Sequence, residues 1–167
     1  MSKNKKTTAP NSSRRKFVKN AALALGGITI VPRHVLGRGF IAPSDKLNIA
    51  AIGAGGKGAS DIANAWDNGA NNVVALCDVD FARAKAGTDK FRTAKKYADF
   101  RVMLEEMKND IDAVTISTPD HVHGMAAMAA MQLGKHVYVQ KPLTHNIREA
   151  RMLTEAARKY KVVSQMG

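Results

Sequence analysis

Short apolar runs alternate with helical patterns along the chain from Leu47 onward. The runs predict strands over Leu47–Ile52, Val73–Cys77, Lys96–Ala98, Asp112–Ser117, His136–Gln140 and, near the end, from Lys161 to Gln165. Between them, apolar residues recur at spacings of three and four, which is typical of helices with one buried face. This alternation indicates βαβ units. We expect a doubly wound parallel sheet of about six strands with helices on both faces.

A glycine-rich turn follows the first predicted strand. Residues 53–58 read G-x-G-x-x-G, and Asp78 lies twenty positions after Gly58, at the end of the second predicted strand. Gly53 allows a tight turn, and Gly55 lets the backbone approach a pyrophosphate. Gly58 lets the following helix pack closely against the sheet. This order and spacing predict a dinucleotide-binding Rossmann fold, with a glycine turn of another α/β fold as the alternative.

Acidic side chains after the second strand bear on the choice of cofactor. Asp78 is predicted to accept hydrogen bonds from the adenosine ribose hydroxyls and to repel a 2′-phosphate, which favours NAD over NADP. Gly56 and Lys57 are the other loop residues predicted to bind the cofactor. Because Lys57 is a cation near phosphate, it slightly weakens the preference for NAD over NADP. Asp80 is the alternative ribose ligand, or else it caps a helix that opens at Phe81.

Capping signals mark three later helices. Asp99 and Asp120 are predicted N-caps, and Gly134 is a plausible glycine just after the helix that Asp120 opens. Asn146 and Glu149 resemble a capping box. One face of the helix before Gly134 is expected to be core, and it carries Met125, Met128, Ala129 and Gln132.

Positive charge is concentrated at the N-terminus. The chain has 167 residues and a formal net charge of +12, but residues 47–167 hold sixteen Lys and Arg against thirteen Asp and Glu. The folded part therefore lacks the basic excess of a nucleic-acid-binding domain, and no nucleic-acid partner is expected. Residues 13–19 read S-R-R-K-F-V-K, a twin-arginine pattern, and the uncharged stretch 20–31 is too short to span a bilayer.

These features divide the chain into three parts. Residues 1–36 are predicted to be a twin-arginine leader that directs export to the periplasm, either cleaved or kept as a membrane anchor. The alternative is a disordered basic tail. Residues 37–45 are a predicted linker, and 46–167 the nucleotide domain. Cys77, the single cysteine, is expected to be a small buried residue. His121 and His123 do not share a helical face, so no metal site is predicted.

Two further motifs lie where the fourth and fifth strands end. They are T-P-x-x-x-H, from Thr118 to His123, and K-P, at Lys141-Pro142. With strand order 3-2-1-4-5-6 both lie beside the nicotinamide half of a bound cofactor. With the glycine loop, these motifs resemble the N-terminal domain of the Gfo/Idh/MocA family over about Lys46–Gly167, and the leader resembles that of exported members. The usual family motif is E-K-P, and Gln140 stands where glutamate is usual.

The resemblance implies an NAD-dependent oxidoreductase that transfers hydride between NAD and a sugar, cyclitol or polyol. It implies that Lys141 is catalytic, reaching both the nicotinamide and the substrate hydroxyl. Thr118, Pro119, His123 and Pro142 are then expected to contact the cofactor along with Lys141. Lys141 is otherwise a solvated strand-end lysine, and His123 a histidine in the first turn of a helix.

In the family, a second α/β domain supplies the catalytic histidine and acid. That domain is expected to be absent from this chain, which is therefore predicted to be inactive alone, and any homo-oligomer would form through the absent domain. Two other functions stay open. One is an NAD-dependent glycosidase, which acts by transient oxidation and elimination. The other is a nucleotide-binding fragment without catalysis.

Overall fold

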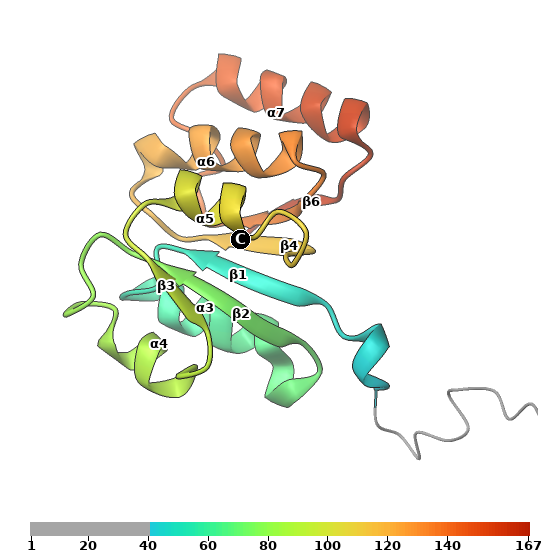
Figure 1. The fold of residues 1–167 in the computed structure, drawn as a ribbon. Coiled ribbons are helices and arrows are strands. Elements are labelled where there is room, and N and C mark those ends of the chain that lie inside the picture. Colours follow the sequence, from blue (N-terminus) through green and yellow to red (C-terminus); the bar gives the residue numbers. More distant parts are fainter. Residues whose placement is uncertain (1–40) are drawn as a thin grey trace, which may run out of the picture. The chain divides into compact units, whose positions relative to one another are not determined.

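A computed structural model describes residues 41–167 (Figure 1). The predicted leader and the first residues of the predicted linker lie outside the described residues. Residues 43–167 form one compact unit, which opens with a short 3-10 turn, η1 (Pro43–Asp45). Among the described residues, no helix combines the length and the hydropathy needed to cross a membrane.

A parallel six-stranded sheet, in the order β3-β2-β1-β4-β5-β6, forms the centre of this unit. Its strands are β1 (Asn48–Ile52), β2 (Asn72–Cys77), β3 (Lys95–Tyr97), β4 (Ala113–Ile116), β5 (His136–Val139) and β6 (Ser164–Met166). The predicted doubly wound Rossmann fold is confirmed. The sixth strand begins later than predicted, because Lys161 adopts a left-handed conformation (φ 55°) that ends the preceding helix.

Helices cover both faces of the sheet (Figure 1). One face carries α3 (Lys57–Trp66) and α4 (Lys85–Lys90), and the other α5 (Phe100–Glu106), α6 (Asp120–Gln132) and α7 (Ile147–Tyr160). Successive side chains of β1 alternate between the two resulting cores: Ile49 packs with Ile62 of α3, and Ile52 with Met103 of α5. Because both faces are covered, the inner strands are apolar on both sides.

Most of the predicted helix ends are confirmed. The Asp99 carboxylate accepts a hydrogen bond from the N–H of Arg101 (2.9 Å), and Asn146 Oδ1 accepts one from the N–H of Glu149 (2.9 Å). Gly134 has a φ of 73°, the left-handed conformation expected just after a helix.

Two local predictions are wrong, and a third, the buried face of α6, is right only in part. Helix α6 begins at Asp120 itself, because Pro119, with its φ fixed by the ring, takes the N-cap position. Of the face of α6 predicted to be core, Met128 and Ala129 pack against the core, whereas Met125 is 59% exposed and Gln132 is exposed. Three of the six buried residues of α6 are alanines, which let the helix lie close to the sheet. The segment after Asp80 forms turns, and α4 begins only at Lys85.

Candidate functional site

The glycine turn joins β1 to α3 at a point where no side chain would fit. Gly53 has a φ of 80°, and a Cβ built on it would lie 2.7 Å from the carbonyl oxygen of Ser117. A Cβ on Gly58 would lie 1.7 Å from the carbonyl oxygen of Gly53. Both glycines therefore let α3 begin directly against the ends of β1 and β4.

The N-terminus of α3 has no side-chain cap. Its N-cap residue is Gly56, with a φ of 53°, and no side chain bonds the first N–H groups of the helix. Such groups, together with the helix dipole, favour an anion. The guanidinium of Arg83, which sequence reasoning did not single out, comes within 3.6 Å of the position that a Cβ would take on Gly56. The loop is thus suited to a diphosphate.

Asp78 lies against this loop. Its Oδ2 accepts a hydrogen bond from the N–H of Gly55 (2.8 Å), and its Oδ1 accepts one from the N–H of Asp80 (2.9 Å). A carboxylate has about four acceptor positions, so Asp78 retains capacity for ribose hydroxyls. Asp80 accepts hydrogen bonds from the backbone N–H groups of Ala82 (3.0 Å) and Arg83 (3.1 Å). Asp80 therefore caps the turn, whereas Asp78 bonds the glycine loop, and both carboxylates line the same cavity. The role of Asp78 as ribose ligand stays a prediction.

A cavity of about 940 Å³ opens beside the loop. Six of the predicted site residues line it: Gly53, Gly55, Lys57, Asp78, Thr118 and Pro119. Its volume is in the range of ordinary ligand sites, of roughly 300–1,000 Å³. Met125 and Val122 of α6 supply apolar walls, Arg83 supplies a cation near the loop, and Arg101 is paired with Asp99 in the same lining. A dinucleotide therefore fits the donors, the charge and the space found here.

The other predicted site residues lie outside that lining. Gly56 and Gly58 belong to the loop but do not line the cavity, and His123, Lys141 and Pro142 lie outside the lining as well. Lys141 is exposed, and its ammonium has no ion-pair partner among residues 41–167. The Lys141–Pro142 peptide bond is cis. The cofactor and catalytic roles of these residues stay predictions.

His123 connects the two strand-end motifs. Its side chain is buried, with Nε2 2.8 Å from the carbonyl oxygen of Thr118 and Nδ1 2.6 Å from that of Pro142. Both partners are acceptors, so a neutral ring donates to one of them and a doubly protonated ring to both. The buried ring of His123 thus lies between the end of β4 and the Lys-Pro turn, within hydrogen-bonding distance of a carbonyl oxygen in each.

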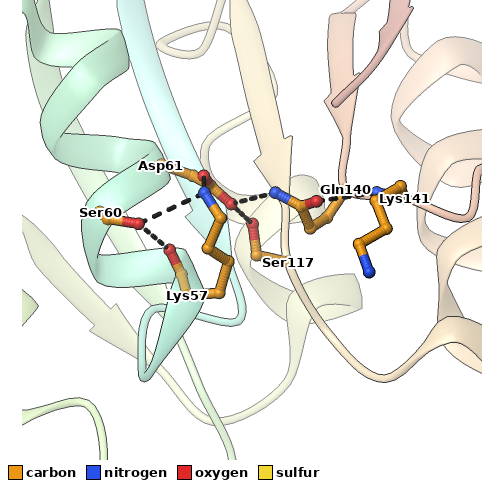
Figure 2. Close-up of polar contacts among 6 residues, drawn as sticks. All are labelled: Lys57, Ser60, Asp61, Ser117, Gln140 and Lys141. Carbon is orange, nitrogen blue, oxygen red and sulfur yellow. Dashed lines mark hydrogen bonds and ion pairs between the residues drawn. The ribbon is translucent and has the colours of Figure 1, made fainter.

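Asp61 is a site residue that sequence reasoning missed (Figure 2). It lies on α3 with a side chain only 2% exposed. Its Oδ2 accepts hydrogen bonds from Ser117 Oγ (2.7 Å) and Gln140 Nε2 (3.0 Å), and its Oδ1 accepts one from the ammonium of Lys57. A local signal existed, because Asp61 lies one helical turn before Ala65, which packs against the core.

The protonation state of Asp61 follows from these contacts. Burial acts to raise the pKa of its carboxyl, but the hydrogen bonds from Lys57, Gln140 and Ser117 outweigh burial and lower that pKa. The hydrogen bond to Asp61 raises the pKa of Lys57. Asp61 is therefore a buried carboxylate at neutral pH, and the Lys57 ammonium lies against it rather than in the open loop.

Cys77 is buried at the end of β2, as predicted. Burial, with smaller contributions from the charges of Asp99 and Asp78, raises the pKa of its thiol to about 12. At neutral pH it is therefore a protonated thiol with no nucleophilic character. A second cavity, of about 630 Å³, lies at the opposite ends of the strands, beside Asn48, Asn72 and Lys95, and contains none of the motif residues. Residues 41–167 hold no cluster of three metal-ligating side chains.

Comparison with known proteins agrees with this geometry. The sequence model described as "Oxidoreductase family, NAD-binding Rossmann fold" matches residues 47–167. The chain belongs to the Gfo/Idh/MocA family. It is an NAD-binding Rossmann domain of that oxidoreductase family.

The curated relatives are much longer than this chain, and some of the matches cover only part of it. Inositol 2-dehydrogenase of Salmonella typhimurium is 33% identical over 88 residues, which is 52% of this chain and 26% of that protein. A glycosyl hydrolase family 109 protein of Solibacter usitatus is 32% identical over 152 residues, which is 83% of this chain and 34% of that protein. The chain thus spans about a quarter to a third of the relatives it matches.

Solved structures show the same fold. An NAD-binding oxidoreductase from Klebsiella pneumoniae is 36% identical with a TM-score of 0.58, over 73% of this chain and 34% of that one. Scyllo-inositol dehydrogenase from Lactobacillus casei, solved with NAD(H) and scyllo-inositol, has a TM-score of 0.65 at 23% identity, over 73% of this chain and 36% of that one. The second likeness supports the fold alone.

Proposed function

We propose that this domain serves an NAD-dependent oxidoreductase that transfers hydride between NAD and a hydroxyl-bearing carbon of a sugar, cyclitol or polyol. One observation carries the proposal: three separate motifs meet at one end of the sheet. The glycine turn packs on Ser117, and His123 links Thr118 to Pro142. The loop that suits a diphosphate is thereby joined to the turn that bears Lys141.

The residues of this chain divide the work between binding and orientation. NAD, when bound, supplies the hydride acceptor. The glycine loop and the N-terminus of α3 hold the diphosphate, and Asp78 holds the ribose and disfavours a 2′-phosphate. Lys141 donates a hydrogen bond to the reacting hydroxyl and stabilises negative charge on its oxygen as hydride leaves. We propose that the 167-residue chain alone binds NAD without turnover, so turnover by the purified chain would contradict this point.

Lys141→Ala should lower kcat of the whole protein by about 100-fold or more, because a donor that stabilises developing charge is removed. The dissociation constant for NAD should change by less than about threefold, because the diphosphate and ribose contacts remain. Production of NADH from a polyol measures the first quantity, and calorimetry the second. Lys135→Ala, at the other end of β5, is the control. A Lys141→Ala protein with wild-type turnover would remove Lys141 from the mechanism.

An NAD-dependent glycosidase is the second candidate. It is favoured by the reach of the glycosyl hydrolase family 109 match, which covers 83% of the 167 residues, or about 139. That match therefore extends before residue 47, where the family match begins. In such a reaction a transient oxidation acidifies a neighbouring C–H, elimination follows, and NAD is unchanged overall. Net NADH supports the dehydrogenase, whereas a released sugar without net NADH supports the glycosidase.

We propose export by the twin-arginine route to the periplasm, supported by the S-R-R-K-F-V-K pattern of residues 13–19. This route carries folded proteins, which suits a domain that must acquire its nucleotide before export. Changing Arg14 and Arg15 together to lysine should retain the protein in the cytoplasm, because the paired arginines are the recognised feature. Immunoblots of periplasmic and cytoplasmic fractions measure this outcome. Unchanged export of the double variant would point to another route.

A further inference from the structure

The buried carboxylate of Asp61 determines how the side-chain amide of Gln140 is oriented (Figure 2). Gln140 Nε2 donates to Asp61 Oδ2 (3.0 Å), and Gln140 Oε1 accepts from the backbone N–H of Lys141 (3.0 Å). A carboxylate only accepts hydrogen bonds, and an N–H only donates. The amide is therefore fixed in one of its two possible orientations.

Three elements are joined at the carboxylate of Asp61, which accepts hydrogen bonds from both Ser117 and Gln140. Asp61 comes from α3, one helical turn after the glycine loop, and Ser117 comes from the end of β4. Gln140 follows β5 and precedes Lys141 directly. No polar side-chain atom in the described residues is both buried and without a partner, so this network is fully satisfied. A satisfied buried network in a medium of low dielectric constant holds its members rigidly.

A glutamate could not take the place of Gln140 in this network. An ionised carboxylate has no donor, and it would lie about 3 Å from a second buried carboxylate, an arrangement in which both do not stay ionised. The chain departs from the E-K-P motif at the one position that contacts Asp61. The Asp61 carboxylate and the Gln140 amide are therefore a matched pair, with the charge on α3 and the donor directly after β5.

We propose that Asp61 is a positioning residue that supplies, from α3, the negative charge that the E-K-P motif carries after β5. Acting through the amide of Gln140, it holds the backbone of Lys141 at a fixed place just after β5. Only the catalytic role of Lys141 rests on the proposed function. The coupling between Asp61 and Gln140 stands on the geometry alone.

A charge-rescue experiment, in which a second substitution compensates for the first, tests this coupling. Gln140→Glu, which restores the usual motif, should lower the thermal midpoint of the chain by about 10 °C at pH 7.5. This decrease in the thermal midpoint should become smaller as the pH is lowered to about 5, because the introduced carboxyl can then hold a proton and donate a hydrogen bond to Asp61. Adding Asp61→Asn to Gln140→Glu should recover most of the midpoint at pH 7.5, because a single charge and a donor are again paired. The pH profile and the rescue would not follow from a loss of packing.

The backbone N–H of Lys141 gives a second readout. Its hydrogen exchange, measured by NMR, should be about tenfold faster in Gln140→Glu than in the wild type and should return toward the wild-type rate in the double variant. Asp89→Asn is the matched control, because Lys85 and Asp89 repeat the four-residue spacing of Lys57 and Asp61 on an exposed surface. It should leave both the midpoint and the exchange unchanged.

Clear outcomes separate this inference from the proposed function. If Gln140→Glu is as stable as the wild type at pH 7.5, or if the double variant is no better than the single one, the coupling is wrong. If Gln140→Glu does not fold at pH 7.5, the double variant and the measurement near pH 5 still decide. Calorimetric titration of the wild-type chain with NAD tests the function separately. A chain that binds no NAD but shows the rescue would overturn the function and support the coupling.

Discussion

Gly58→Ala should strongly destabilise the domain and weaken its binding of NAD. The new Cβ would lie 1.7 Å from the carbonyl oxygen of Gly53 and 3.2 Å from the Cβ of Ser117. The Gly53 carbonyl oxygen is a backbone atom, so the clash is removed only if α3 moves away from β1. That movement would also separate Ile62 from the core in which it packs. Clashes of this kind belong to the group of substitutions that cost about 4 kcal/mol or more, in a domain whose total stability is about 5–15 kcal/mol.

Urea unfolding followed by circular dichroism measures this cost, and NAD titration measures the accompanying loss of binding. Gly134→Ala is the matched control. Gly134 also adopts a left-handed conformation that favours glycine (φ 73°), but a Cβ there would meet nothing within 4 Å. That variant should lose only about 1–2 kcal/mol, the cost of the left-handed conformation itself. A Gly58→Ala chain that unfolds at the wild-type urea concentration would show that α3 does not need the close approach.

The fold could be predicted from the sequence because its main signals are local. The glycine loop and the strand-end acid are local patterns, in which the spacing alone encodes a turn, a helix start and a second strand. Asp99 and Asn146 were likewise predicted as caps because a cap bonds a residue two or three positions away. Where a local pattern competes with tertiary packing, packing decides. Met125 is exposed because the alanines of α6 give a closer approach to the sheet.

The side-chain contacts that define the site could not be predicted from the sequence, because they join positions that are far apart along the chain. Gln140 and Asp61 are 79 residues apart in sequence, and neither has a recognisable partner until the sheet places β5 beside β4 and β4 beside α3. The sequence showed a departure from a motif at Gln140 but not what compensates for it. His123 was found by its motif, yet its two backbone partners come from separate strand ends and could only be seen in the structure.

The second large effect concerns Asp78. Asp78→Ala should weaken NAD binding by about 10- to 100-fold, the range expected for losing hydrogen bonds to a charged acceptor. Part of that loss would come from the loop, because Asp78 also holds the N–H of Gly55. The ratio of NAD to NADP affinity removes this ambiguity, because a loosened loop weakens both nucleotides alike. The ratio should fall toward one, since the negative charge that repels a 2′-phosphate is gone.

Calorimetric titration of the same variant with both nucleotides gives the ratio. Asp80→Ala is the control, because its carboxylate bonds the backbone of the turn before α4 rather than the loop. Asp80→Ala should reduce stability while keeping the wild-type preference for NAD. If Asp80→Ala shifts the ratio and Asp78→Ala does not, the ribose ligand is Asp80. Then the contact between Asp78 and Gly55 is a structural tie of the loop, and the cofactor preference depends on a residue two positions farther along the chain.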